Sequence, residues 1–279
     1  HLSNIITLSD GLIWRQERAV MDMKLADKRA LVCASSSGLG YACAAALLKE
    51  GASVWINGRD ASRLEAARQR LLADIGGQVQ AVVADITTQE GRAALLAACP
   101  DADILVNNNA GPEPGNFFDF DEQAWLTALQ GNLLAALMLI RALAPGMRAR
   151  RFGRIINITS AMVSTPRGHM TLSAASRAGL TAACKGLSRE FVADNVTINN
   201  LLPERFDTPR QQQMAHVAMA QRGITFQQAR QSQIDSIPAG RMGLPEEFGA
   251  ACVYLCSEMS GYMTGQNMHL DGGAYPALL

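Results

Sequence analysis

The chain has little charge of either sign and few aromatic residues: charged residues make up 18% of its 279 residues and aromatic residues 5%. Its 25 basic residues balance its 25 acidic ones, and the sequence contains neither a block of lysine and arginine nor a basic stripe interleaved with aromatic residues. These absences argue against nucleic acid or an anionic membrane as the main partner. We therefore expect the partner to be a small molecule.

Long apolar segments are also missing. The longest covers residues 133–140, far short of the roughly 20 residues that a helix needs to cross a bilayer. A charged start followed by an apolar core, which is typical of a signal peptide, is not seen either. These features predict no membrane association and a cytoplasmic location.

The cysteines form no recognisable framework. The six are Cys33, Cys43, Cys99, Cys184, Cys252 and Cys256. They form no CxxC pair, and no histidine stands at zinc-ligand spacing beside them. Because most of them fall inside predicted strands or helices, we expect small buried thiols rather than disulfides or a metal site.

The length and the apolar content are compatible with one large core. With 48% hydrophobic residues, residues 21–279 are expected to fold as a single domain. Residues 1–20 have a mixed composition and precede the first clear strand. We interpret them as an N-terminal extension or an artificial tail, with Met21 or Met23 as the natural start.

Predicted strands and helices alternate along the chain. The expected strands cover residues 29–33, 52–57, 78–84, 103–107, 154–159, 196–201 and 267–270. The expected helices cover residues 41–50, 61–74, 88–98, 121–149, 171–193 and 245–258. This alternation predicts an α/β fold with a parallel sheet, helices on both faces, and ligands beyond the carboxyl ends of the strands. The glutamine-rich residues 203–243 interrupt it and are expected to form a substrate loop or lid.

A turn of small residues, 33–40, follows the first predicted strand. Its sequence Cys-Ala-Ser-Ser-Ser-Gly-Leu-Gly leads into an alanine-rich helix that Gly51 ends. Free N–H groups and the helix dipole at such a helix start favour an anion, and Gly38 and Gly40 let its backbone approach closely. The turn predicts a phosphate site; taken alone, it is equally compatible with a tight connection in an α/β fold.

Polar residues follow the next two predicted strands. Arg59 comes about 20 residues after the turn, where an acidic residue binds a ribose 2′-hydroxyl and a basic residue binds a 2′-phosphate. Arg59 therefore favours NADP(H), with a solvated loop arginine as the alternative. Asp85 and Ile86 end the third strand and are candidates for adenine contact, although Asp85 is equally plausible as a helix cap.

From about residue 24 to residue 275 the chain resembles the classical short-chain dehydrogenase/reductase family. Residues 34–40 resemble its TGxxxGxG loop with alanine in place of the first glycine, and residues 108–111 resemble its NNAG motif, preceded by an extra asparagine, Asn107. Leu202-Pro203-Glu204 resembles its Pro-Gly turn with the glycine lost. Thr264-Gly265-Gln266 and Asp271-Gly272-Gly273 resemble its carboxyl-terminal signature.

The resemblance implies a Rossmann-type, doubly wound, mainly parallel seven-stranded sheet and bound NADP(H), with NAD(H) as the alternative cofactor. It also implies a homotetramer and an activity like that of 3-oxoacyl-[acyl-carrier-protein] reductases or related carbonyl reductases. Ser160, at the end of the fifth strand, and Asn132, within the long helix, match catalytic positions of the family. The expected cofactor contacts include the phosphate turn, Arg59 and the Asp85-Ile86 pair. The full set is Ala34, Ser36, Ser37, Gly38, Leu39, Gly40, Arg59, Asp85, Ile86, Asn109, Ala110, Gly111, Arg177, Pro203 and Thr208.

The chain departs from the family at two catalytic positions. Thirteen residues after Ser160, where the family has Tyr-x-x-x-Lys, it has Ser173-Ala-Ala-Ser-Arg177. By the resemblance, the tyrosine gives or takes the carbonyl proton; a serine hydroxyl is shorter and a much weaker acid. Arg177 holds a permanent positive charge and donates hydrogen bonds, but it cannot relay a proton. Cofactor binding is therefore expected to survive better than chemistry.

His169 is a candidate replacement for the missing proton donor. It stands four residues before Ser173, and an imidazole titrates near neutrality; an exposed loop histidine is the alternative. The preferred interpretation is an NADP(H)-dependent oxidoreductase that acts on a carbonyl or hydroxyl substrate with an atypical Ser160, Ser173 and Arg177 site. The alternative is a cofactor-binding pseudoenzyme that serves as a sensor or an assembly subunit.

Overall fold

A computed structural model of the chain describes residues 6–7, 13–14 and 21–278. Strands β1 (Ile6–Thr7) and β2 (Ile13–Trp14) pair with each other antiparallel. The other residues of the predicted N-terminal extension, 1–5, 8–12 and 15–20, lie outside the described residues.

The main sheet has seven strands in the order β5-β4-β3-β6-β7-β8-β9, and every pairing within it is parallel. Their bounds are β3 (Arg29–Val32), β4 (Ser53–Gly58), β5 (Val79–Val83), β6 (Ile104–Asn107), β7 (Gly153–Ile158), β8 (Val196–Pro203) and β9 (Asn267–Leu270). The chain winds outward from β3 in both directions, so the strand order reverses between β3 and β6. Ligands of open parallel sheets bind beyond the carboxyl ends of the strands at this switch point. The predicted fold class is confirmed.

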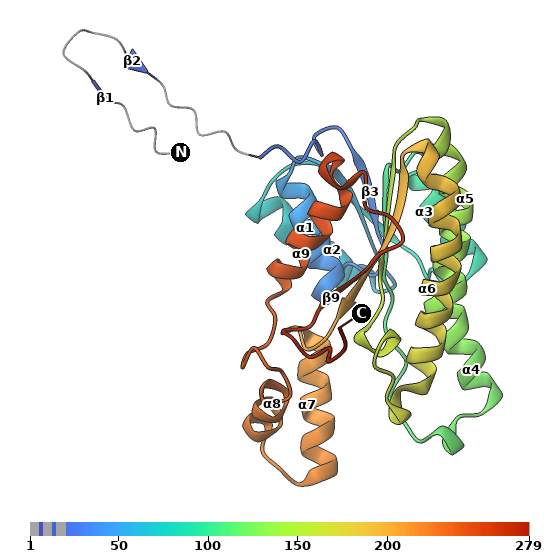
Figure 1. Ribbon diagram of the computed structural model, residues 1–279, viewed down its shortest axis with the longest axis vertical. Helices are drawn as coiled ribbons and strands as arrows, with labels where there is room; N and C mark the ends of the chain where they lie inside the picture. The colour runs from blue at the N-terminus through green and yellow to red at the C-terminus, as the bar shows by residue number, and fades with distance from the viewer. Residues whose placement is uncertain (1–5, 8–12, 15–20, 279) are drawn as a thin grey trace.

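Helices cover both faces of the sheet (Figure 1). On one face lie α1 (Gly38–Lys49), α2 (Ala61–Asp74) and α9 (Pro245–Cys256), whose apolar residues share a core with β3 and β4. On the other lie α3 (Gln89–Ala98), α4 (Glu122–Leu129), α5 (Ala135–Ala149) and α6 (Thr171–Phe191). All six cysteines are buried and unpaired, in agreement with the expectation of buried thiols.

The predicted helix over residues 121–149 is interrupted. Residues Gln130–Leu134 form a π-helical turn between α4 and α5. By length and composition the whole segment Glu122–Ala149 is apolar enough to cross a membrane. Its buried residues, however, pack into the core on this face of the sheet with α3 and α6, as those of a core helix do. The sequence did not indicate this segment because the prediction considered only the longest unbroken apolar run, residues 133–140.

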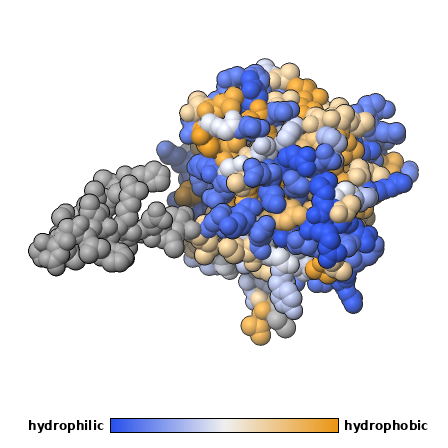
Figure 2. Space-filling model, turned by 90° about the horizontal axis from the view of Figure 1, so that it is seen from above, coloured by the Kyte–Doolittle hydropathy of each residue, from blue (hydrophilic) through white to orange (hydrophobic). Residues whose placement is uncertain are grey.

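Two helices of the predicted lid, α7 (Pro209–Arg222) and α8 (Phe226–Asp235), extend beyond the carboxyl ends of the strands (Figure 1). The opposite end of the molecule, seen from above in Figure 2, carries mostly hydrophilic residues with smaller hydrophobic areas between them. Helices α7 and α8 therefore lie at the same end of the sheet as the polar residues that follow the strands.

Candidate functional site

The phosphate turn leads into α1, whose N-terminus has no side-chain cap. Ser37, the N-cap residue, is extended and makes no side-chain hydrogen bond to the first turn of α1, so the first N–H groups of the helix are available to an anion. Gly40 cannot be replaced, because a Cβ there would lie 2.5 Å from the carbonyl oxygen of Ala34 and 2.8 Å from Nδ2 of Asn108. Asn108 donates to that same carbonyl oxygen over 3.1 Å, which ties the Asn-Asn-Ala-Gly loop to the turn.

Asn57 connects the ends of three neighbouring strands at the base of this turn. Its Nδ2 donates to the carbonyl oxygens of Val82 (3.1 Å) and Ala84 (3.0 Å), and its Oδ1 accepts from the backbone N–H of Ala34 (3.3 Å). The buried hydroxyl of Ser35 accepts from the backbone N–H of Asn57. Sequence reasoning did not single out Asn57, although an asparagine within the apolar strand Val-Trp-Ile-Asn is a detectable signal.

The basic end of the site lies where β4 and β5 finish. Arg59 is 71% exposed, and its Nη1 lies 3.8 Å from Oδ2 of Asp85. Partial burial raises the pKa of Asp85, but hydrogen bonds from Thr87 and the charge of Arg59 hold it below its usual range. Asp85 is therefore ionised at neutral pH and also serves the turn before α3, because Thr87 donates both its N–H and its hydroxyl to Oδ1.

Ser160 lies at the other end, directly after β7. Its backbone is extended, and its Oγ accepts a hydrogen bond from the N–H of Met162 over 3.2 Å, which caps the short 3-10 turn Ala161–Val163. This contact uses a lone pair and leaves the hydroxyl hydrogen free to donate. A serine hydroxyl held in this way can donate a hydrogen bond to a carbonyl group in the cleft.

Arg177 reaches from α6 to the same point. Its Nη1 donates to the carbonyl oxygens of Ile158 (2.8 Å) and Thr159 (2.9 Å), the two residues before Ser160. Burial, followed by the nearby charge of Arg210, lowers the pKa of Arg177 to about 10. The guanidinium is therefore still protonated at neutral pH.

One cleft of about 590 Å³ joins these parts. It brings together most of the residues that the sequence predicted. These are Ala34, Ser36, Ser37, Gly38, Leu39, Arg59, Asp85, Ile86, Asn109, Ala110, Gly111, Ser160, Arg177, Pro203 and Thr208. Gly40 allows the close packing of the turn but does not line the cleft. The cleft also contains residues that the sequence did not indicate, among them Asp60, Arg63, Glu113, Arg205 and Arg210.

Asn132 lies behind this cleft, in the π-helical turn. It lines a small adjoining cavity of about 20 Å³ together with Asn107 and Arg177. Its Nδ2 donates weakly to the carbonyl oxygen of Ala128 over 3.4 Å, and its buried Oδ1 has no protein partner among the described residues. Asn109 donates to the carbonyl oxygen of Gly131, so the Asn-Asn-Ala-Gly loop also fixes the π turn.

A sequence model of the family described as enoyl-(acyl carrier protein) reductase matches residues 33–275. The chain belongs to the short-chain dehydrogenase/reductase family. It is 33% identical over 254 residues to nodulation protein G of Rhizobium sp. (strain N33), covering 90% of this chain and 98% of that protein. It is 30% identical over 252 residues to the 3-oxoacyl-[acyl-carrier-protein] reductase FabG of Haemophilus influenzae, covering 89% and 98% of the two chains.

A solved structure of the family gives the same fold. The L-sorbose reductase of Gluconobacter frateurii, complexed with NADPH and L-sorbose, superposes with a TM-score of 0.88 at 32% identity. The match covers 92% of this chain and all of that one. The architecture around the cleft is therefore that of the short-chain dehydrogenase/reductase fold.

Two further residues predicted to be catalytic line neither the cleft nor the small cavity beside it. Ser173, at the position of the family tyrosine, is buried in the first turn of α6 and lies outside the lining of both cavities described above. His169 is exposed and also lies outside that lining, while its carbonyl oxygen accepts a hydrogen bond from the N–H of Gly115. The structure thus brings Ser160 and Arg177 together but does not bring His169 to them.

Proposed function

We propose that this protein is an NADP(H)-dependent oxidoreductase that interconverts a carbonyl and a hydroxyl group on a small molecule. The observation that carries the proposal is the single cleft that holds the open N-terminus of α1, Arg59 and Ser160. An anion site, a basic residue and a hydroxyl donor in one cleft match the phosphates of a dinucleotide and a polarised carbonyl group.

The residues of the cleft fit NADP(H). The uncapped start of α1 suits a pyrophosphate, and the Gly40 contact described above shows that its backbone makes a turn too tight for a side chain. Arg59 is mostly exposed and, beside its 3.8 Å contact with Asp85, has further donors for a 2′-phosphate. The residue before it, Gly58, carries no carboxylate. The NADPH complex of the related L-sorbose reductase supports the same assignment. NAD(H) would lack the partner for Arg59.

When bound, NADPH supplies the hydride that reduces the substrate carbonyl. Ser160 donates its hydroxyl hydrogen to the carbonyl oxygen and stabilises the negative charge that develops there. Arg177 adds positive charge beside Ser160 but keeps its own proton, since its pKa of about 10 lies well above neutrality. Because no tyrosine lines the described cleft, we assign the final proton to water, which costs about 10²–10⁴-fold in rate compared with a positioned general acid.

A cofactor-binding pseudoenzyme is the second candidate. It is favoured by the burial of Ser173 away from the cleft, which removes the side chain at the position of the family's proton donor. Such a protein would bind NADPH through the same residues and act as a sensor or an assembly subunit.

We also propose a homotetramer, a lid formed by residues 203–243, and a cytoplasmic location. The tetramer is supported by exposed apolar residues on the α4–α5 segment, Leu126 (51%) and Leu134 (40%). The lid is supported by the ion pair between Arg210 of α7 and Glu113 (2.6 Å), which links α7 to the loop after β6; both residues line the cleft. Six free buried thiols support a reducing compartment.

A panel of carbonyl compounds, followed by NADPH oxidation, tests the proposed function. Oxidation of NADPH that depends on one compound and is lost in Ser160→Ala supports the oxidoreductase. Tight binding of NADPH without oxidation by any compound would favour the pseudoenzyme.

A further inference from the structure

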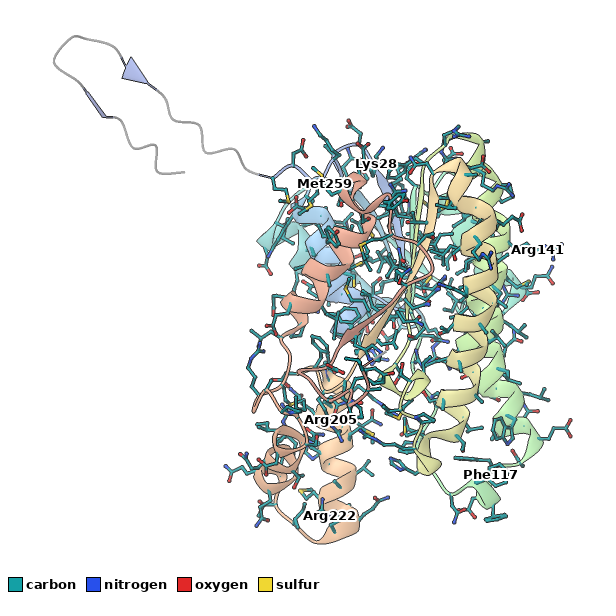
Figure 3. The ribbon with its side chains drawn as sticks, in the orientation of Figure 1. Lys28, Phe117, Arg141, Arg205, Arg222 and Met259 are labelled. Atoms are coloured by element: carbon teal, nitrogen blue, oxygen red, sulfur yellow. The ribbon has the colours of Figure 1, made fainter. Side chains whose placement is uncertain are left out.

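Arg205 occupies a strained and largely covered position in the cleft. It follows β8 with φ of +53°, a left-handed conformation that costs a residue with a Cβ about 1–2 kcal/mol. It lines the cleft, yet only 22% of its side chain is exposed. Figure 3 labels it near the end of α7 that is closest to the sheet. Strained residues that their surroundings hold in place are concentrated at binding and active sites.

Two contacts fix the guanidinium of Arg205. Its Nε lies 3.3 Å from Oε1 of Glu204, a carboxylate that is only 11% exposed. Its Nη1 donates to Oε1 of Gln211 on α7 over 3.1 Å. Its Nη2 makes no hydrogen bond with any residue in the described part of the chain. Arg205 is therefore held in one place and still has donors for a ligand.

Gln211 offers a second donor at the same place. An arginine only donates hydrogen bonds, so the amide of Gln211 turns its oxygen toward Arg205 and its Nε2 away from it. That Nε2 has no acceptor among the described residues, and Gln211 lines the cleft together with Arg205. The lid side of the cleft, formed by its lining residues from Arg205 to Gln213, thus presents two neighbouring hydrogen-bond donors.

The charges on the lid side of the cleft are balanced. Arg205 lies beside Glu204, and Arg210 lies 2.6 Å from Glu113. Arg167 also lies 3.8 Å from Glu204, but it is 44% exposed and does not line the cleft, so water screens its charge. A ligand carboxylate at Nη2 of Arg205 would be repelled by the nearly buried carboxylate of Glu204. An uncharged oxygen atom would meet no such repulsion.

The lid side of the cleft offers little apolar surface. Phe206 lines the cleft but is 6% exposed, and its ring packs edge-on against Phe248 in the core (ring centroids 5.2 Å apart). Among the described residues of α7 that line the cleft, no large apolar side chain is exposed. A long acyl chain finds no binding surface there, whereas a hydroxyl group finds two donors.

Arg205 and Ser160 hold equivalent positions on neighbouring strands. Strands β7 and β8 pair in parallel, and Ser160 comes two residues after β7 as Arg205 comes two residues after β8. The proposed function places the reacting carbonyl at Ser160. On the basis of that function, we propose that the substrate is an uncharged hydroxy ketone, with a hydroxyl group one or two carbons from the carbonyl, which Arg205 and Gln211 select. Its reduction consumes one NADPH and one proton and yields a diol.

The test uses four compounds with the same four-carbon skeleton: butan-2-one, 1-hydroxybutan-2-one, 4-hydroxybutan-2-one and 2-oxobutanoate. The wild type, Arg205→Met and Gln211→Met are assayed for kcat/KM with NADPH, for NADPH affinity, and for the shift in Tm that each compound causes in the NADP⁺-loaded protein. Arg222→Met and Gln221→Met are the matched controls, because both residues are exposed on α7 outside the cleft lining, with Arg222 at the far tip (Figure 3). Circular dichroism verifies the fold of each variant.

The wild type and both controls should prefer at least one hydroxy ketone over butan-2-one and over 2-oxobutanoate by about tenfold to a hundredfold, the range expected for a hydrogen bond from a charged donor. Arg205→Met should abolish this preference. Gln211→Met should reduce it by about twofold to tenfold, as expected for a neutral hydrogen bond. If no compound is reduced but a hydroxy ketone still raises the Tm of the wild type and not of Arg205→Met, the hydroxyl site stands and the proposed function fails.

Four results would overturn the hydroxyl site. The first is an equal response of the wild type to butan-2-one and both hydroxy ketones, with reduction of all three leaving the proposed function intact. The second is a preference for 2-oxobutanoate, which would indicate a charged substrate. The third is a response to none of the four compounds by either readout. The fourth is weaker NADPH binding by Arg205→Met with an unchanged preference for the hydroxy ketone, which would assign Arg205 to the cofactor.

Discussion

Nη1 of Arg59 lies 3.8 Å from Oδ2 of Asp85. This contact joins the residues that follow two neighbouring strands, β4 and β5. Asp85 is held in place by its hydrogen bonds from Thr87. Arg59 is thereby oriented at the cleft, yet 71% of its side chain is exposed. An arginine that is positioned but not covered keeps donors free for a phosphate.

Arg59→Ala should remove the preference for NADPH over NADH. The wild type is expected to bind NADPH more tightly by about tenfold to a hundredfold, since a charge-assisted hydrogen bond contributes about 1.5–3 kcal/mol. Fluorescence titration of both cofactors provides the measurement. Arg68→Ala, which removes an arginine paired with Glu65 on α2 outside the cleft, serves as the control. Equal affinity for the two cofactors in the wild type would refute the role of Arg59.

Ala34→Gly should stabilise the protein. Ala34 has φ of +44°, a left-handed conformation that costs a residue with a Cβ about 1–2 kcal/mol, whereas the family has glycine at this position of the loop. After the greater unfolded-state entropy of glycine is subtracted, a gain of about 0.5–1 kcal/mol is expected. For a chain of this length, this corresponds to a rise in Tm of about 1–2 °C.

Ala45→Gly, in the middle of α1, is the matched substitution and should instead lower the stability by about 0.5–1 kcal/mol. Calorimetry on both variants separates the two effects. A loss of stability in Ala34→Gly would show that the backbone of the turn carries no strain at this residue.

The strands and helices near this turn were predictable because local signals set them. Helix α2 begins and ends where the sequence placed it, since Asp60 accepts a hydrogen bond from the N–H of Arg63 as an N-cap should. The parallel order followed from the alternation of elements. The cofactor residues then fell into one cleft because the ends of parallel strands lie at the same edge of the sheet.

Asn157→Leu should destabilise the protein by about 2–6 kcal/mol. Asn157 accepts from Asn107 over 2.9 Å and donates to Asn200 over 2.8 Å, and Asn200 continues the chain to Asn267. These residues are in register on β6, β7, β8 and β9. Leucine has a similar size but leaves one buried donor and one buried acceptor unpaired, each costing about 1–3 kcal/mol.

Thr197→Val on β8 gives the opposite case. The hydroxyl of Thr197 is fully buried and has no hydrogen-bond partner among the described residues. Its removal should therefore leave the free energy of unfolding unchanged or raise it by at most about 3 kcal/mol. Urea denaturation of both variants compares them. Similar losses in the two would mean that the asparagine chain contributes no more than packing.

Several parts of the site depend on contacts between distant residues and could not be predicted. The π turn forms where Gln130 donates to the carbonyl oxygen of Thr87 and Asn109 to that of Gly131, and nothing in residues 130–134 alone indicates it. The ion pair of Glu113 with Arg210 joins the loop after β6 to helix α7, between residues 97 positions apart in the sequence. His169 is close to Ser160 in the sequence, but the residues between them place it outside the lining of the cleft.

Ser173→Tyr combined with Arg177→Lys should restore a positioned proton donor. A gain in kcat of about 10²–10⁴-fold on a simple ketone is expected if the hydroxyl reaches the cleft. Ser173→Phe with Arg177→Lys adds the same ring without the hydroxyl and should show no gain. A crystal structure is required, because Ser173 is only 3% exposed and overpacking costs about 1–3 kcal/mol. A correctly placed tyrosine without a gain in rate would mean that more than the proton donor is absent.

Transfer of deuterium from NADPH labelled at C4 to a carbonyl substrate tests the central claim most directly, because mass spectrometry detects even slow turnover. The wild type should place deuterium on the new carbinol carbon, faster with NADPH than with NADH. His169→Ala should keep this rate within about twofold, while Ser160→Ala should lose about 10²–10³-fold. Saturating NADPH binding with no deuterium in any product would contradict the assignment as an oxidoreductase and leave a cofactor-binding protein without chemistry.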